Sequence, residues 1–182
     1  MSAFLSAEKF KAQRLIFLIL FFSGASWSQT ANHSWEGYAQ ASLTKTESIL
    51  GDSATGFRVG TVWKPDPAFG LVADFASQSG SSIGKPTYAT FMGGPRFYSA
   101  ENFHLSGFLQ ALGGAYRASK ISQLQKSTQW GYIVGGGAGF DIRLVDHLAL
   151  RPLEYDLMFL GSGSGVTLVP RVSSGLVLRF GR

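Results

Sequence analysis

The stretch from Pro170 to Arg182, PRVSSGLVLRFGR, decides the fold. Every second residue from Val172 to Phe180 is apolar or small, whereas Arg171 and Arg179 lie in the opposite phase. A period of two is typical of a β-strand and not of a helix. The chain therefore ends in an amphipathic strand with an aromatic residue near its terminus.

The same alternation recurs seven more times upstream. We predict strands over residues 34–44, 55–64, 68–77, 87–98, 103–117, 129–143 and 147–159. Each is close to or longer than the ~9–11 residues that a tilted membrane strand needs.

The expected connections alternate in length. Three are short and rich in turn-forming residues, namely 64–67, 99–102 and 144–146. Four are longer and polar, namely 45–54, 78–86, 118–128 and 160–169. This alternation predicts an all-β protein, an eight-stranded antiparallel transmembrane up-and-down β-barrel with both termini in the periplasm.

A soluble eight-stranded barrel with its apolar face inside is the main alternative. The polar phase of the strands argues against it, because ions in a dry core are costly unless they are paired. We expect apolar side chains to face lipid and a charge network to fill the lumen, which is narrow enough for side chains to fill. The predicted network is Glu36, Arg58, Asp74, Arg96, Asp141, Arg143, Glu154, Asp156 and Arg179.

Two local features need explanation within this fold. In the seventh strand, Leu148 and Leu150 are in one phase and Leu153 and Tyr155 in the other, so we predict a β-bulge near Pro152. The run GGGAG at residues 135–139 lacks the Gly-Lys-Ser/Thr ending of a phosphate-binding loop, and glycine inside a strand more often marks curvature or close backbone approach.

The N-terminal residues 1–28 have the layout of a secretory signal peptide. Lys9, Lys11 and Arg14 precede the apolar run 15–22, and small residues follow it. Ser26 and Ser28 fit the −3 and −1 positions of a cleavage site, which leaves residues 29–182 as the β-barrel domain. The apolar run is shorter than the ~20 residues of a membrane-spanning helix.

Composition excludes several other classes of protein. The chain has no cysteine, which excludes a disulfide-stapled fold and a thiolate zinc site. Its formal charge is +5, but the basic residues are scattered and form no stripe of the kind that binds nucleic acid. The three histidines are too dispersed to suggest a metal site, so we expect no metal and no cofactor.

Several segments resemble small bacterial outer-membrane β-barrel proteins of the OmpA-like, porin-related group. They are residues 93–97 (GGPRF), 108–114 (FLQALGG), 135–141 (GGGAGFD), 147–155 (HLALRPLEY) and 175–181 (GLVLRFG). The resemblance implies an eight-stranded barrel in the outer membrane of a Gram-negative bacterium and offers no catalytic residue to carry over.

The C-terminal spacing also resembles the assembly signal that the barrel-assembly machinery reads. Its residues here are Ser173, Gly175, Leu178 and Phe180. Gly181 and Arg182 depart from the pattern, since many such barrels end on the aromatic residue.

These features favour a monomeric barrel with a structural or surface-interaction role and no enzymatic activity. Outer-membrane lipid and lipopolysaccharide are the expected partners, the basic segment 118–128 being a candidate contact for phosphates. A small or gated porin-like channel is the alternative, although water-filled channels need ~16–18 strands. A lipid A-modifying enzyme is less favoured: His104 and Ser106 match a His-x-Ser pattern, but no acid follows before Asp141.

Overall fold

The computed structural model describes residues 34–45, 53–80, 87–99, 104–122, 125–162 and 165–181. The predicted signal peptide, residues 1–28, lies outside these ranges, as do the connections 46–52 and 81–86. No helix in the described part of the chain has the length and apolarity needed to cross a membrane.

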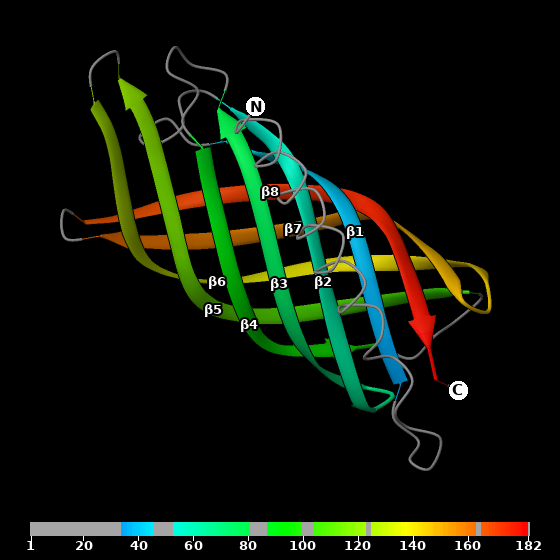
Figure 1. Ribbon diagram of the computed structural model, residues 1–182. Coiled ribbons are helices and arrows are strands. Elements are labelled where there is room, and N and C mark those ends of the chain that lie inside the picture. The colour runs from blue at the N-terminus through cyan, green and yellow to red at the C-terminus, as the bar shows by residue number, and fades with distance from the viewer. Residues whose placement is uncertain are drawn as a thin grey trace, which may run out of the picture. The chain divides into compact units, whose positions relative to one another are not determined.

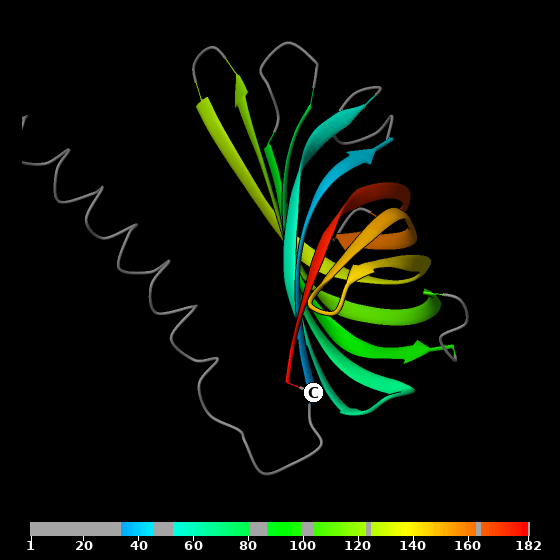
Figure 2. The same cartoon turned by 90° about the vertical axis from the view of Figure 1, so that its right-hand side faces the viewer.

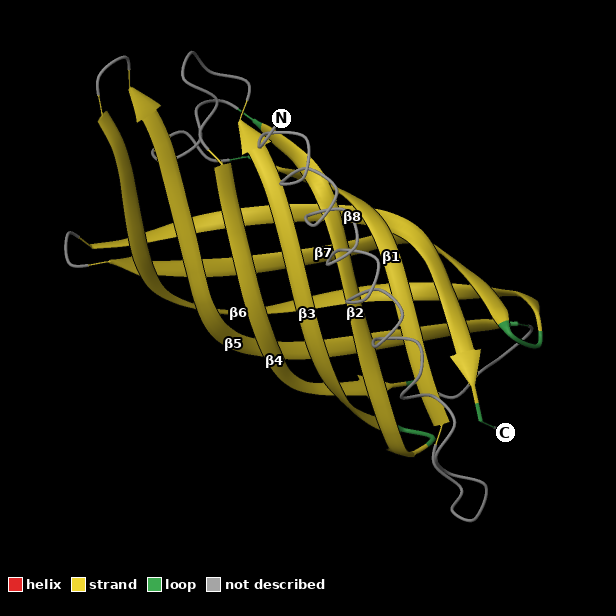
Figure 3. Ribbon diagram, viewed as in Figure 1, coloured by secondary structure: helices red, strands yellow, loops and turns green. Residues whose placement is uncertain are grey.

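The described residues form eight antiparallel strands that close into a barrel (Figures 1 and 3). Each strand pairs with its neighbours in sequence, and β1 pairs with β8 to close the ring. The strands are β1 Ser34–Thr44, β2 Ala54–Asp66, β3 Phe69–Gly80, β4 Thr87–Tyr98, β5 Leu105–Ser122, β6 Gln125–Val145, β7 Leu148–Ser162 and β8 Gly165–Phe180. The fold class predicted from the sequence is confirmed.

The two ends of the barrel differ. One end, here called the turn end, holds the start of β1, the end of β8 and the tight turn at Asp146 and His147. Trp35 pairs there with both Phe180 and Trp63. The opposite end, here called the loop end, holds the end of β1, the start of β2, the end of β3 and the start of β4. In Figure 1 the start of β1 and the tip of the β8 arrow lie side by side.

The two faces of the strands have opposite chemistry. Trp35 is 44% exposed beside Glu36 at 2%, and Phe97 is 54% exposed beside Arg96 at 0%. The same alternation runs through β1 and β3 in full. The outer surface is therefore apolar and the interior carries the charges, the reverse of a soluble barrel, and this arrangement suits strands that face lipid.

Pro152 lies in a β-bulge, as predicted. Between Arg151 and Glu154, β7 has one residue more than β8, and it has the same extra residue against β6 between Leu150 and Leu153. Proline has no backbone N–H to offer to a ladder, so a bulge accommodates it. The bulge shifts the phase of β7, so that Arg151 and Glu154 both point inward although they are an odd number of residues apart.

The two hairpins on the C-terminal side are longer than predicted. Residues 118–128 and 160–169 were expected as loops, but β5 and β6 continue to Ser122 and from Gln125, and β7 and β8 continue to Ser162 and from Gly165. Backbone pairing carries both hairpins. The mostly polar β5–β6 extension gives little apolar alternation, whereas in β8 Val166 and Leu168 do alternate outward but follow a run of glycine and serine. Figures 1 and 2 show the β5–β6 hairpin rising beyond the strands beside it.

Some inward glycines make room for large side chains. A Cβ on Gly60 would overlap the Tyr38 ring, and a Cβ on Gly137 would overlap the Asp156 carboxylate. Both glycines thus stand where a neighbouring strand sends a bulky side chain across the wall. Gly137 in the glycine run of β6 therefore allows close packing in the interior, which agrees with the interpretation of this run as a site of close approach.

Candidate functional site: the charged interior

The interior of the barrel concentrates charged side chains. Among the described residues, the fully buried charges are five carboxylates and four guanidinium groups. They are Glu36, Asp74, Asp141, Glu154, Asp156, Arg58, Arg96, Arg151 and Arg171. Because ions removed from water are costly unless paired and hydrogen-bonded, their pairing decides whether this interior is stable.

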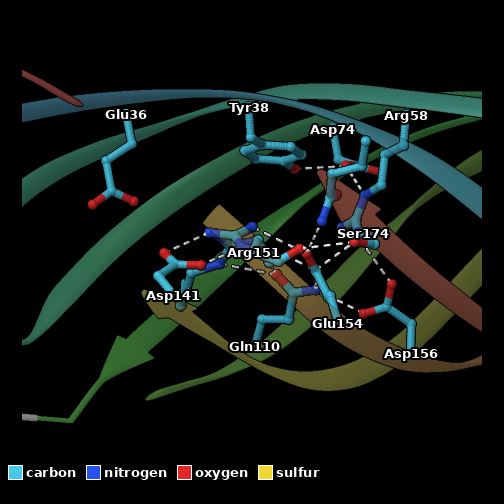
Figure 4. Close-up of polar contacts among 12 residues, drawn as sticks. Glu36, Tyr38, Arg58, Asp74, Gln110, Asp141, Arg151, Glu154, Asp156 and Ser174 are labelled. Atoms are coloured by element: carbon cyan, nitrogen blue, oxygen red, sulfur yellow. Dashed lines mark hydrogen bonds and ion pairs between the residues drawn. The ribbon is translucent and has the colours of Figure 1, made fainter. Parts of the chain in front are cut away.

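Glu154 is the centre of the network (Figure 4). Its carboxylate accepts hydrogen bonds from Gln110 Nε2 at 2.6 Å and Gln40 Nε2 at 3.0 Å. It also pairs with Arg58 at 2.7 Å, with Arg151 at 3.0 Å and with Arg96 at 3.5 Å. These donors come from β1, β2, β4, β5 and β7 itself, so one carboxylate links five strands across the lumen.

Asp74 and Asp156 form a second group toward the loop end. Arg58 donates from Nε to Asp74 and from Nη1 to Asp156, the latter at 3.0 Å. Arg171 donates to Asp156 from Nη2 at 2.8 Å, and the Tyr38 hydroxyl donates to Asp74 at 2.6 Å. Arg58 therefore joins this group to Glu154.

A third group closes the turn end. Glu36 accepts from the Tyr98 hydroxyl at 2.7 Å and from Lys64 at 3.2 Å, and Arg179 lies 3.4 Å from it. Asp141 accepts two hydrogen bonds from Arg151, at 2.6 and 3.0 Å. The Lys64 and Arg179 side chains are 15% and 14% exposed, so the network meets solvent at this end.

Most of the charged residues named from the sequence meet in this network. Glu36, Arg58, Asp74, Arg96, Asp141, Glu154 and Asp156 are buried within it, and Arg179 joins at the turn end. Arg143, the remaining member of the predicted network, is half-buried on β6 near the turn end, two residues beyond the buried Asp141.

The predicted network did not contain two central arginines: Arg151 was missed, and Arg171 was placed on the polar face but not in the network. Arg151 lies just before the bulge that separates it from Glu154. In the sequence, only its alternation with the outward Leu148 and Leu150 indicates that Arg151 points inward. Arg171 lies in the polar phase of the last strand, where its burial could be predicted but not its partner, Asp156. Among the uncharged members, Gln110 falls on the polar face of its strand, but nothing in the sequence indicates that it bridges Arg96 and Glu154 or that Tyr38 donates to Asp74.

Toward the loop end the inward side chains are uncharged, and aromatic and aliphatic residues lie among polar ones such as Gln78 and Thr90. Tyr88 and Tyr116 pack with ring centroids 5.6 Å apart, and Ile133, Leu160 and Val169 are buried beside them. The gap among Met92, Leu112, Met158 and Arg171 leaves no room for a water molecule. The described interior is thus charged from the turn end to the middle of the barrel and uncharged toward the loop end.

The His-x-Ser pattern forms no catalytic arrangement in the described residues. His104 is an exposed turn residue with a φ of 69°. Ser106 accepts a long hydrogen bond from Arg179 at 3.4 Å, and Asp141, its partner in register, is bound to Arg151. No cluster of three or more metal-ligating side chains occurs within the described ranges.

The residues of the predicted assembly signal lie on both faces of β8. Ser173 is buried in the lumen, and a Cβ on Gly175 would overlap the backbone of β1 at Ala39. Leu178 and Phe180 are 43% exposed on the outer face. Their recognition by an assembly machinery stays a prediction.

Comparison with known proteins supports the fold alone. No family model matches the chain, and no curated protein matches it. Among solved structures, Neisserial surface protein A has a TM-score of 0.63 at 14% identity, covering 84% of this chain and 98% of that one. Ail, the attachment invasion locus protein of Yersinia pestis, has a TM-score of 0.55 at 19% identity, covering 83% and 100%.

A third similar structure is the N-terminal β-barrel domain of Pseudomonas aeruginosa OprF. It has a TM-score of 0.56 at 12% identity and covers 84% of this chain and 100% of that domain. The outer-membrane protein OprG of the same bacterium has a TM-score of 0.51 at 14% identity. By its fold, this chain is a small eight-stranded β-barrel of the kind found in bacterial outer membranes.

Proposed function

We propose that the protein is an integral outer-membrane barrel whose lumen is closed to solutes by its own side chains. In this proposal it acts as a monomer in a structural or surface-interaction role, with lipid around it and its loop end toward the cell exterior. The single observation that carries the proposal is the Glu154 network, which ties five strands together across the middle of the barrel.

Two further observations support closure. Eight strands leave an interior just wide enough for side chains, and a buried uncharged layer with Tyr88 and Tyr116 lies on the loop-end side of the charges. A solute would have to separate buried ion pairs, each costing about 3–5 kcal/mol to break, and then pass the packed side chains of the uncharged layer.

A small or gated channel is the second candidate. Its support is the partial exposure of Lys64 and Arg179 at the turn end, which gives water access to one side of the network. A channel function would require the Glu154 group to rearrange.

Conductance of the purified protein in planar bilayers tests the proposal. We expect little or no steady current from the wild type. The double variant Glu154→Ala/Arg58→Ala removes both partners of one ion pair in the network. In folded protein it should raise the frequency of current steps. Large, stable, ohmic currents from the wild-type monomer would contradict closure and favour the channel.

We also propose that the protein is not an enzyme. The support is that Asp141, the acid in register with Ser106, is bound to Arg151 and so is engaged in the network. A deacylation assay on lipid A compares the wild type with Ser106→Ala. Activity in the wild type that the substitution abolishes would overturn this proposal.

A further inference from the structure

Arg117 breaks the charge pattern of the barrel. Every other acidic or basic strand residue whose side chain is described points into the lumen or lies at the end of a strand, whereas Arg117 lies on the outer face of β5 and is exposed. Its neighbours in register are Ala89 on β4 and Trp130 on β6, both on that same outer face. A charge on the outer surface of a membrane barrel is costly at mid-depth, so its position along the strand matters.

Arg117 lies at the edge of the apolar band. On β5 the outward positions run from Leu105 at the turn end through Leu109 to Ala115, and Arg117 follows. With a rise of ~3.3 Å per residue and a tilt of ~45°, Arg117 stands roughly 28 Å above Leu105. The apolar band of an outer-membrane barrel is ~25 Å tall, so the guanidinium lies at the level of lipid headgroups.

Trp130 holds the guanidinium in place at this level. The Arg117 Cζ atom lies over the Trp130 ring, 5.5 Å from its centroid, and Trp130 is 66% exposed on the outer face. A cation–π contact does not use up the five N–H donors of a guanidinium, which stay available to a further partner. None of the ion pairs between described residues includes Arg117.

We propose that Arg117, stacked on Trp130, binds a phosphate group of the glycolipid in the surrounding outer leaflet. A planar guanidinium matches the oxygens of a phosphate bidentately, and headgroup phosphates are the anions present at this depth. The inference rests on the proposed outer-membrane location with the loop end outside. It goes beyond it by naming the residue pair and the chemical group that the pair binds.

Lipid binding to the folded protein in detergent micelles tests the proposal. The probe is lipid A with two phosphates, compared with dephosphorylated lipid A, and native mass spectrometry gives the bound fraction. We expect the wild type to bind the phosphorylated form preferentially. Because Arg117→Gln removes the charge-assisted hydrogen bonds to the phosphate, it should weaken binding at least about tenfold, and Arg117→Lys should give an intermediate loss.

Lys45 supplies the matched control, because it is an exposed cation at the same end of the barrel. Lys45→Gln should change the affinity by less than about twofold, as expected for a screened surface charge. An equal effect of Lys45→Gln and Arg117→Gln would reduce the site to general electrostatics and overturn the proposal. Equal binding of both lipid A forms would overturn it too.

Two further measurements separate the possible failures. Inorganic phosphate in large excess should not displace the lipid, and full displacement would indicate a site for soluble anions. Insertion into lipid vesicles, measured by protease protection, tests the membrane location by itself. A wild type that inserts but shows no phosphate preference contradicts the Arg117 site alone, whereas a wild type that does not insert contradicts the proposed function.

Discussion

At the scale of single residues, Glu154 has the densest set of partners, and its charge is what the surrounding arginines require. Glu154→Gln keeps the volume but removes the charge that pairs with Arg58, Arg96 and Arg151. We expect the free energy of unfolding to fall by about 3–5 kcal/mol, the cost of leaving a buried ion without its partner. Urea unfolding in lipid vesicles measures it.

The control for this substitution is Asp146→Asn, which removes a carboxylate from an exposed turn. It should change the free energy of unfolding by no more than about 0.5 kcal/mol, as is usual for surface substitutions. Similar losses for the two variants would mean that net charge, and not the Glu154 network, sets the stability.

Arg96 gives a test of facing by the sign of its effect. Arg96 donates to Gln110 at 3.0 and 2.6 Å and stacks over Phe108 at 4.1 Å inside the barrel. Arg96→Ala should therefore lower the free energy of unfolding. If the side chain faced lipid instead, its removal would stabilise the barrel, since arginine at the bilayer midplane costs ~2–4 kcal/mol.

Gly137 tests how tightly the wall and the interior fit. A Cβ at this position would overlap the Asp156 carboxylate, which Arg58 and Arg171 hold. Gly137→Ala should destabilise the barrel by about 1–3 kcal/mol through overpacking. Gly113→Ala is the control, because its Cβ would face outward with its nearest neighbour at 3.9 Å. A neutral Gly137→Ala would show that Asp156 can move without loss.

At the scale of elements, the projecting β5–β6 hairpin is separable from the barrel. β4 pairs with β5 only as far as Ser119, and β7 pairs with β6 only from Tyr132. Residues 120–127 can therefore be replaced by Asn-Gly, a two-residue turn that suits a hairpin. We expect the melting temperature of the shortened protein to stay close to that of the wild type.

The shortened hairpin also separates two sources of lipid binding. It retains Arg117 and Trp130 but lacks Lys120 and Lys126. Undiminished binding of phosphorylated lipid A would assign the contact to the Arg117–Trp130 pair. Loss of binding would assign it to the lysines of the hairpin.

The elements also show what the sequence can and cannot predict. Period-two alternation is a local property, so strands such as β1 and β3 and the phase change at Pro152 could be read directly. The extensions of β5 and β6 could not, because their mostly polar residues pair through the backbone and leave little apolar pattern. In β8 the outward Val166 and Leu168 do alternate, but the glycines and serines before them hide where the strand starts. The partners of Glu154 depend on the register of five strands, and one-residue bulges alter that register beyond what alternation specifies.

At the scale of the whole molecule, the orientation in the membrane is open to a direct test. The chain contains no cysteine, so single cysteines can be introduced without a competing thiol. Lys45→Cys lies at the loop end and Asp146→Cys at the turn end, and both native residues are exposed. A membrane-impermeant maleimide on intact cells should label the first and not the second. The opposite pattern would reverse the proposed orientation.

The division between a charged, interlocked interior and an apolar outer surface has a consequence for how such a sequence diverges. Any apolar residue serves at an outward position such as Leu153 or Phe159, whereas inward positions such as Glu154 are tied to partners on several strands. Drift should therefore be fast on the outside, and changes on the inside should come as compensated exchanges. Two barrels can then share this fold with few identical residues; this chain and Neisserial surface protein A are 14% identical. For sequences of this architecture, the alternation of polarity and the pairing of inward charges should be better markers of the fold than residue identity.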